Sequence, residues 1–326
     1  MKRACLERSR RVAVVGGGTG TYTVLTGLRK HKIALTAIVS MADSGGSSGR
    51  LRDEFGVLPP GDVRQCLLAL SHLPLEKTSL RQLLEYRFHN GRGLKGHSFG
   101  NLLLTALTEI TGREDLAIKE AAKILAVRGK VLPVSLEDST LCARLEDGTI
   151  IKGETNIDVR RVRPDLKIID LFLDPPIKIF PEASQAIRAA DLIVLGPGDL
   201  YTSVLPNILV TGLNQALAKA KGRLVYICNL MTKHGETDNF SCSDFLREIQ
   251  RYLGPAKKKL KTMLVNNDLS VPKKVLQRYQ GEKSFPVEID CQVCDELGVK
   301  VIVKPLAAAG QLWRHDSTKL ARALMV

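Results

Sequence analysis

Two glycine-rich segments near the start of the sequence have the composition of phosphate-binding loops. GGGTGT (16–21) follows the apolar run Val12–Val15, and DSGGSSGR (43–50) follows a second apolar run. Glycines let a backbone approach a phosphate closely, and the N–H groups at the start of a helix point toward the anion. Asp43 stands where dinucleotide folds often present an acid to a ribose, and hydroxyls beside Arg50 suit phosphate or sugar oxygens. Both segments therefore indicate nucleotide chemistry.

Four further polar segments lie after predicted strands or before predicted helices. They are PPGDVR (59–64), GHSFGN (96–101), GPGDLYTS (196–203) with the following LPN, and NLMTKHGET (229–237). Several such loops at one edge of a sheet predict a large, pre-formed pocket. For His97 we favour a structural role over catalysis, because a lone histidine is more often structural. Asp43 and Asp62 could bind Mg²⁺, although for Asp62 we favour a role as the N-cap of a helix.

The elements that must position these loops alternate between short β-branched runs and helical patterns. Residues 11–40 form a predicted βαβ unit, and strand patterns recur at Ile168–Leu173, Leu192–Leu195, Leu224–Cys228, Met263–Val265 and Val299–Val303. This alternation predicts an α/β, Rossmann-like fold with a mostly parallel sheet and helices on both faces. We expect residues 11–130 to form the first part of the core and residues 166–326 the remainder.

The segment 131–165 breaks the alternation and predicts a small β-rich lobe inserted in the core. Its run LCARLEDGTIIKG has two strand-like halves around Asp147-Gly148, which is a strong hairpin signal. Before this lobe, we expect one helix to be capped by Ser98 and to end at Gly112. Another is expected to run to about Val127, with Gly129 at its end.

Composition excludes several classes of protein. The formal net charge is +14, but only 5% of residues are aromatic and no nucleic-acid-binding motif is evident, so nucleic acid is not expected as the main partner. No apolar run reaches the roughly 18–20 residues of a membrane span, and the N-terminus lacks a signal peptide, so we expect a cytoplasmic protein. The seven cysteines do not form a disulfide pattern. Cys291 and Cys294 form a lone CxxC, without the second pair that a zinc site needs, and we interpret them as half-buried thiols near a strand.

Two nucleotide-binding classes fit less well. Thr21 occupies the position of the third glycine of a dinucleotide fingerprint, which argues against nicotinamide chemistry. GGGTGT is also similar to the tubulin-type GTPase signature, but that motif lies in the middle of its chain and continues with glycine.

Taken together, the motifs resemble those of the YvcK/CofD-like family, in the same order. They are VAVVGGGTGTYTVLTGL, DSGGSSGRLR, PPGDVRQCLLALS, LKGHSFGNLLLTALTEITG, GPGDLYTSVLPNILV and MTKHGETDNFS, and the resemblance extends from residue 11 to RHDSTKLARAL. The CofD branch transfers 2-phospho-L-lactate from a guanosine diphosphate-linked donor with a divalent metal. The YvcK branch, the bacterial gluconeogenesis factors, binds UDP-sugars such as UDP-N-acetylglucosamine and supports growth and cell shape on gluconeogenic carbon.

The sequence is more similar to the YvcK branch, in GLKGHSFGNLLL, in residues 122–149 and in the final RHD. The resemblance implies a nucleotide-sugar-binding regulatory protein, with a metal-dependent CofD-type transferase as the alternative and no catalytic residue assigned. It implies a protein partner in envelope synthesis or carbon regulation, and a homodimer is a candidate assembly. It also implies phosphorylation by a kinase near Ser317 and Thr318; the alternative is that these residues are an ordinary helix start. The expected ligand is a UDP-sugar, and Mg²⁺ is the one candidate cofactor. The expectation of Mg²⁺ is weakened by Ser44, which stands where many relatives have a second aspartate.

The resemblance implies that Gly17, Gly18, Thr19 and Gly20 cradle the diphosphate, with Asp43 beside it. It also implies that Asn207 and Arg314 contact the nucleotide sugar, and for Arg314 this rests on the resemblance alone. The loops and the resemblance together predict a nucleotide-binding set made of Gly17, Gly18, Thr19, Gly20, Thr21, Asp43, Ser44, Gly45, Gly46, Ser47, Arg50, Gly61, Asp62, Arg64, His97, Asn101, Gly196, Gly198, Tyr201, Thr202, Ser203, Asn207, Asn229, Thr232 and Arg314.

Overall fold

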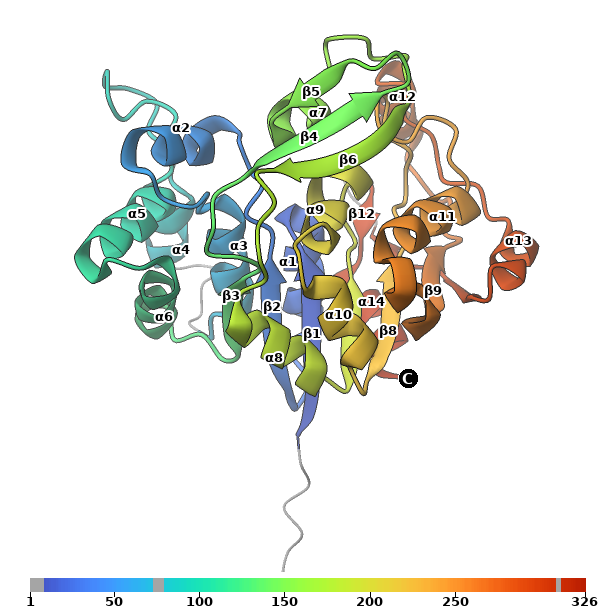
Figure 1. Ribbon diagram of the computed structural model, residues 1–326, viewed down its shortest axis with the longest axis horizontal. Coiled ribbons are helices and arrows are strands. Elements are labelled where there is room, and N and C mark those ends of the chain that lie inside the picture. Colours follow the sequence, from blue (N-terminus) through green and yellow to red (C-terminus); the bar gives the residue numbers. More distant parts are fainter. Residues whose placement is uncertain (1–8, 73–78, 309–311) are drawn as a thin grey trace, which may run out of the picture.

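A parallel β-sheet runs through the middle of the molecule. The computed structural model describes residues 9–72, 79–308 and 312–326 (Figure 1), and within them seven strands form this sheet in the order β10-β9-β8-β7-β1-β2-β3, with every neighbouring pair parallel. The strands are β1 (Arg10–Gly16), β2 (Ile33–Val39), β3 (Lys130–Pro133), β7 (Leu192–Leu195), β8 (Arg223–Ile227), β9 (Leu260–Asn266) and β10 (Lys300–Lys304). The predicted Rossmann-like α/β class is confirmed.

Helices cover both faces of the sheet, as expected. In Figure 1, α8 (Pro181–Ala189) and α10 (Leu213–Lys219) lie in front of the sheet, and α1 (Gly18–Leu28) and α14 (Ser317–Met325) lie behind it. The central strands are apolar and almost fully covered because they are sandwiched between these layers; β7 is buried along its whole length. The other helices that flank the sheet are α3 (Gly61–Leu70), α4 (Ser79–Glu85), α5 (Phe99–Thr111), α6 (Glu114–Ile124), α11 (Cys242–Leu253) and α13 (Cys291–Glu296).

A second, antiparallel sheet forms the lobe that lies above the carboxyl edge of the main sheet in Figure 1. It has the order β5-β4-β6, with β4 (Thr140–Leu145), β5 (Ile150–Lys152), β6 (Ile168–Asp174) and the short helix α7 (Glu154–Asp158). The turn at Asp147-Gly148 joins β4 to β5, so the predicted hairpin is confirmed.

Two predicted strand memberships were wrong. We expected Ile168–Leu173 in the parallel sheet, but this run is β6 and pairs antiparallel with β4. Its side chains alternate in burial, because one face of the lobe is solvated, whereas the strands of the main sheet are covered on both faces. Residues 131–133 were expected in the lobe, but they belong to β3 at the edge of the main sheet.

The glycine- and serine-rich segment 43–50 also differs from the expected loop. It is mostly helical, because α2 (Gly46–Phe55) begins within it and ends at Gly56, which adopts a left-handed conformation. The helix buries Ser47, Ser48 and Leu51, so small side chains that suggested a flexible loop instead allow close packing.

Helix ends were predicted with mixed success. Ser98 caps α5 by accepting a hydrogen bond from the N–H group of Asn101, and Gly112 ends that helix, as expected. The next helix, α6, ends at Ile124, earlier than the expected Val127. Ser317 is the first residue of α14, and Asp316 is its cap.

Several short elements connect the parts described so far. A π-helical turn (Leu200–Val204) leads into α9 (Leu205–Ile208), a 3₁₀ turn (Gly254–Lys259) precedes β9, and α12 (Lys273–Gly281) lies near the lobe. The short strands β11 (Ala307–Ala308) and β12 (Arg314–His315) pair just before α14.

The cysteines of the described ranges are free thiols, and Cys5 lies outside those ranges. Among the described helices, none has the length and apolar character that crossing a membrane requires.

Candidate functional site

The strand order of the main sheet reverses between β1 and β7, which pair side by side. In such sheets the loops that follow the two strands diverge to opposite faces and leave a crevice between them, where ligands bind. Here those loops are the turn from β1 into α1 and the segment from Gly196 to Asp199. They approach so closely that a Cβ atom on Gly20 would collide with the carbonyl oxygen of Pro197, so glycine is required at this position.

A cleft of about 670 Å³ opens at this reversal point. Core loops form its floor, the lobe contributes the segment after α7, and α12 and β12 form the remaining wall. Its lining residues are Gly17, Gly18, Thr19, Gly20, Thr23, Asp158, Val159, Arg160, Pro197, Gly198, Asp199, Ser203, Asn229, Leu230, Met231, Thr232, Lys233, His234, Tyr279, Glu282, Ser284, Trp313, Arg314 and His315. This volume accommodates a ligand of the size of a nucleotide or a nucleotide sugar.

The start of α1 lies in the cleft and can receive an anion. Gly17 is extended and Gly18 adopts a positive φ of 63°, which turns the chain sharply into the helix. The Gly18 backbone forms a hydrogen bond with the Asp62 carboxylate. No side chain within the described ranges accepts a hydrogen bond from the N–H groups of Thr19 and Gly20, so these donors, at the positive end of the helix dipole, are left for a ligand.

Arg160 is a buried arginine that reaches the cleft from the lobe. It is only 8% exposed, and its Nη2 group donates to the carbonyl oxygens of Pro164 and Leu166. Its Nε and Nη1 groups are buried without a hydrogen-bond partner. Burial lowers the pKa of Arg160 from its ordinary value, because the charged form is poorly solvated there. Buried donors without partners are costly. Arg160 also lines the cleft, so its positive charge lies beside any anion bound there.

Lys233 lies among three carboxylates at the junction of the lobe and the core. Its Nζ atom contacts Asp158 from the lobe, lies 2.8 Å from Oδ2 of Asp199 and lies 3.0 Å from Oε1 of Glu236. Desolvation opposes the charged amine, but these acids outweigh it and raise the pKa of Lys233. Burial raises the pKa of Glu236 to about 8, although the charge of Lys233 acts in the opposite sense. The three carboxylates could hold a metal ion, but the ammonium group lies among them.

The predicted nucleotide-binding set divides into two groups in the structure. Nine of its members line the cleft: Gly17, Gly18, Thr19, Gly20, Gly198, Ser203, Asn229, Thr232 and Arg314. Asn229 has a buried Oδ1 atom without a partner, which suits a ligand donor. The remaining members do not line it: Thr21, Asp43, Ser44, Gly45, Gly46, Ser47, Arg50, Gly61, Asp62, Arg64, His97, Asn101, Gly196, Tyr201, Thr202 and Asn207.

Some residues outside the cleft join helices instead. Nδ1 of His97 lies 3.1 Å from Oγ of Ser47, and Nε of Arg64 donates to Oδ1 of Asn101 at 2.9 Å. These contacts tie α2 and α3 to the start of α5. Burial and the nearby Arg50 charge lower the pKa of His97, which keeps the imidazole neutral. The structural role favoured for His97 agrees with this packing.

Asp62 does not cap a helix as predicted. Pro60 occupies the N-cap position of α3, and Asp62, in the first turn, instead bonds to the Gly18 backbone. Burial, followed by the charge of Asp43, raises the pKa of Asp62 to about 7. The pKa of Glu154 is raised to about 8 by burial and then by Asp43, so the cradle has an acidic, mutually repelling side.

Sequence reasoning missed the cleft residues that come from the lobe and the C-terminal third. Asp158, Arg160, Tyr279 and Glu282 lie in ordinary helical or polar surroundings, and no local signal identified them. Lys233 lay within a segment that was singled out, and its motif was a usable signal. His315, next to the predicted Arg314, has a buried Nε2 atom without a partner, and burial lowers its pKa to about 4.

Fold and cleft together define a doubly wound α/β protein with a ligand-sized cleft at its topological switch point. The sequence profile described as 2-phospho-L-lactate transferase CofD matches residues 12–307, and the chain therefore belongs to the CofD family.

Individual relatives cover almost the whole chain. The gluconeogenesis factor of Halalkalibacterium halodurans is 44% identical over 321 residues, which are 98% of this chain and 96% of that protein. The gluconeogenesis factor of Bacillus subtilis (strain 168) is 41% identical over 318 residues, 97% of each chain. The crystal structure of protein BH3568 from Bacillus halodurans is similar with a TM-score of 0.91 at 44% identity, covering 98% of this chain and 100% of that one. The predicted resemblance to the YvcK/CofD-like family is confirmed.

Proposed function

We propose that this chain is a nucleotide-sugar-binding regulatory protein of the gluconeogenesis factor type, with a UDP-sugar such as UDP-N-acetylglucosamine as its ligand. The observation that carries the proposal is the pairing of two anion-binding features across one cleft. The open N-terminus of α1 lies on the core side, and the unpartnered Nε and Nη1 groups of Arg160 lie on the lobe side. A diphosphate between them would accept hydrogen bonds from the α1 N–H groups and lie beside the positive charge of Arg160.

Other groups in the cleft suit the two ends of such a ligand. Trp313 and Leu230 offer apolar surface, while Asn229 offers an unpartnered acceptor. The names of the relatives support the gluconeogenesis factor type. The proposal includes a role in growth and cell shape on gluconeogenic carbon.

Regulation would follow from the position of the ligand between lobe and core. A diphosphate that lies beside both Arg160 and the α1 cradle would bind more tightly when the lobe lies close to the core than when the two are apart. This difference in affinity would increase the fraction of molecules in which the lobe lies close to the core. The surface altered in this way would be presented to a protein partner in envelope synthesis or carbon regulation.

The test is a titration with UDP-N-acetylglucosamine, GDP and NAD, each with and without Mg²⁺. The chain has a single tryptophan, and Trp313 lines the cleft, so its fluorescence reports occupancy beside calorimetry. Arg160→Gln should weaken UDP-sugar binding about 10- to 100-fold, corresponding to a charge-assisted bond of about 1.5–3 kcal/mol. The exposed neighbour Arg161 supplies the matched control, Arg161→Gln, which should bind normally. Equal affinities in the two variants, or no UDP-sugar binding by the wild type, would refute the proposal.

A metal-dependent transferase of the CofD type is the second candidate, favoured by the acidic side of the cradle. Asp43 and Asp62 would hold a divalent cation there, because carboxylate oxygens are the donors that Mg²⁺ prefers. Burial and then the charge of Asp43 raise the pKa of Asp62, so the two acids repel each other. The cation would neutralise charge on a bound diphosphate. Preference for a guanine nucleotide, together with Mg²⁺-dependent product formation that Asp43→Asn abolishes, would favour this function over binding alone.

A further inference from the structure

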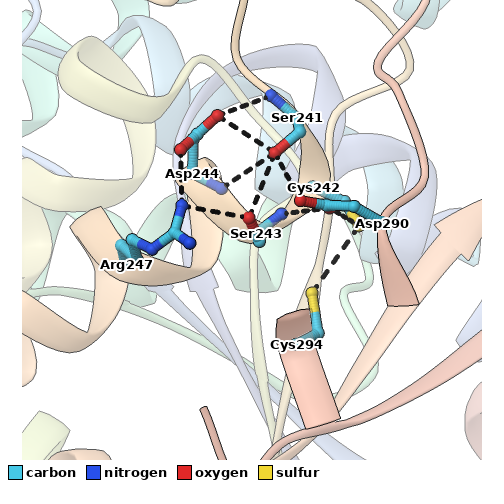
Figure 2. Close-up of polar contacts among 7 residues, drawn as sticks. All are labelled: Ser241, Cys242, Ser243, Asp244, Arg247, Asp290 and Cys294. Atoms are coloured by element: carbon cyan, nitrogen blue, oxygen red, sulfur yellow. Dashed lines mark hydrogen bonds and ion pairs between the residues drawn. The ribbon is translucent and has the colours of Figure 1, made fainter. Parts of the chain in front are cut away.

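Two cysteines and an aspartate from separate parts of the sequence converge where α11 contacts α13. Cys242 is the first residue of α11, Asp290 precedes α13, and Cys294 lies within α13. The Sγ atoms of Cys242 and Cys294 are 3.7 Å apart, and the Cys242 thiol donates to Oδ1 of Asp290 at 3.0 Å (Figure 2). Sequence spacing showed only the Cys291/Cys294 pair; Cys294 proves to be fully buried in a helix rather than half-buried near a strand.

The separation of the sulfur atoms matches a shared metal better than a disulfide. Zinc–sulfur bonds of about 2.3 Å at a tetrahedral angle place two sulfur atoms about 3.8 Å apart. A disulfide requires about 2.05 Å. The potential ligand atoms of Cys242, Asp290 and Cys294 all lie within 4.8 Å of one another, so one ion can reach all three.

Charge and burial also favour a cation at this place. Both thiols are fully buried, so water does not compete for the space between the two sulfur atoms. The carboxylate of Asp290 accepts hydrogen bonds from the Ser241 hydroxyl, the Ser243 N–H group and the Cys242 thiol. Within the described ranges, no lysine, arginine or histidine forms an ion pair with this carboxylate; its compensation comes from hydrogen-bond donors at the start of α11.

We propose that Cys242, Asp290 and Cys294 bind a zinc ion that fastens α11 to α13. Binding replaces the two thiol protons, which leave to solvent, and forms two zinc–thiolate bonds and one zinc–carboxylate bond. These three residues supply the protein ligands, and a water molecule would complete the tetrahedron. With two thiolates and one carboxylate around Zn²⁺ the site has a net charge of −1, which the positive end of the α11 dipole stabilises.

The ion would support the cleft without touching its ligand. Residues 229–241, which carry Thr232 and Lys233, run directly into α11. The segment before α13 pairs with them, through bridges from Met231 to Pro286 and from Ser241 to Glu288. A metal that joins Cys242 to Cys294 therefore closes the far end of this paired region and holds the Lys233 loop in place.

The experiment uses the full chain, freed of metal with a chelator under reducing conditions and titrated with Co²⁺ and then Zn²⁺. We expect one Co²⁺ per chain, with thiolate-to-metal charge-transfer absorption and the visible bands of a tetrahedral ion, both abolished by Zn²⁺. Cys294→Ser should weaken binding by about 100-fold or more, since even residues behind metal ligands contribute 10- to 100-fold. Cys142→Ser is the matched control, because Cys142 is equally buried but lies in the lobe away from the cluster.

A second measurement covers the case in which Cys294→Ser does not fold. In the wild-type chain under mild denaturant, Zn²⁺ should slow alkylation of Cys242 and Cys294, located by peptide mass, but not that of Cys142. Absence of cobalt absorption in the reduced wild type would overturn the proposal, and so would a Cys242–Cys294 disulfide that forms readily while zinc gives no protection. Neither result depends on nucleotide binding, so failure here leaves the proposed function standing.

Discussion

Substitution of Asp62 by asparagine should make the protein more stable at alkaline pH. The pKa of Asp62 is raised from 3.8 to about 7 in the folded state, so between these values the folded chain binds more protons than the unfolded chain. The free energy of unfolding therefore falls as pH rises through this window and levels off above about pH 7. For a carboxylate in an ion pair the dependence is the opposite, and the free energy of unfolding rises with pH. Asparagine has no proton to lose, and its amide oxygen can still accept the hydrogen bond from Gly18.

The magnitude follows from the shift of about three pKa units, which corresponds to about 4 kcal/mol at full development. Roughly 2.5 kcal/mol of this develops between pH 5 and pH 8.5, because part of the penalty is already present at pH 5. Asp62 retains some solvent contact, so screening reduces the expected gain to about 1–2 kcal/mol.

Urea unfolding of wild type and Asp62→Asn at pH 5 and pH 8.5 measures this directly. The difference between the two variants at one pH includes every general effect of the substitution, and the change in that difference with pH isolates the titration. Asp138→Asn, at an exposed carboxylate, is the control and should show no comparable change. A difference between wild type and Asp62→Asn that is the same at both pH values would show that Asp62 is an ordinary carboxylate and that the reasoning is wrong.

Three further outcomes are expected. Gly20→Ala should lower the free energy of unfolding by about 1–3 kcal/mol, because its Cβ atom would collide with a backbone carbonyl, whereas Gly281→Ala has open space and should change little in the same urea assay. Lys233→Ala should lower the free energy of unfolding by about 3 kcal/mol, because the carboxylates around the ammonium group lose their positive partner. In thermal unfolding, millimolar Ca²⁺ should restore part of the lost stability of this variant and should leave the wild type unchanged. Asp43→Asn should lower the midpoint of the pH-dependent stability change, since its charge raises the pKa of both Asp62 and Glu154; an unmoved midpoint would contradict their coupling.

Local patterns predicted those parts of the fold that local physics determines. Val12–Val15 is a continuous apolar run because both faces of β1 are covered, and Ser98 is a cap because its hydroxyl accepts a backbone hydrogen bond. The segment that contains α2 was taken for a loop, since its glycines and serines disfavour an isolated helix, and only packing against α5 makes it helical. Composition cannot show such tertiary support.

The cleft was predicted only in part for a related reason. The turn at Gly17–Gly20 has a mechanism that can be recognised within a few residues. Arg160 and Tyr279 enter the cleft because the lobe and α12 are placed over the sheet edge, and that placement depends on contacts far apart in the sequence. The cluster at Cys242, likewise, joins residues about 50 positions apart. Long-range placement of this kind leaves no periodicity to detect.

The cleft draws its walls from residue 17 to residue 315 of the chain, and this has a consequence for biosynthesis. While the chain grows on the ribosome, the α1 cradle and the lobe can form early, but β12 and Trp313 arrive almost 300 residues after the first glycine of the turn. A nascent chain therefore has no complete binding surface until its last strand has emerged and packed. Ligand in the cell cannot assist the folding of the early segments, and it stabilises only chains whose synthesis has passed residue 315. Occupancy of the cleft would thus mark chains that have finished folding.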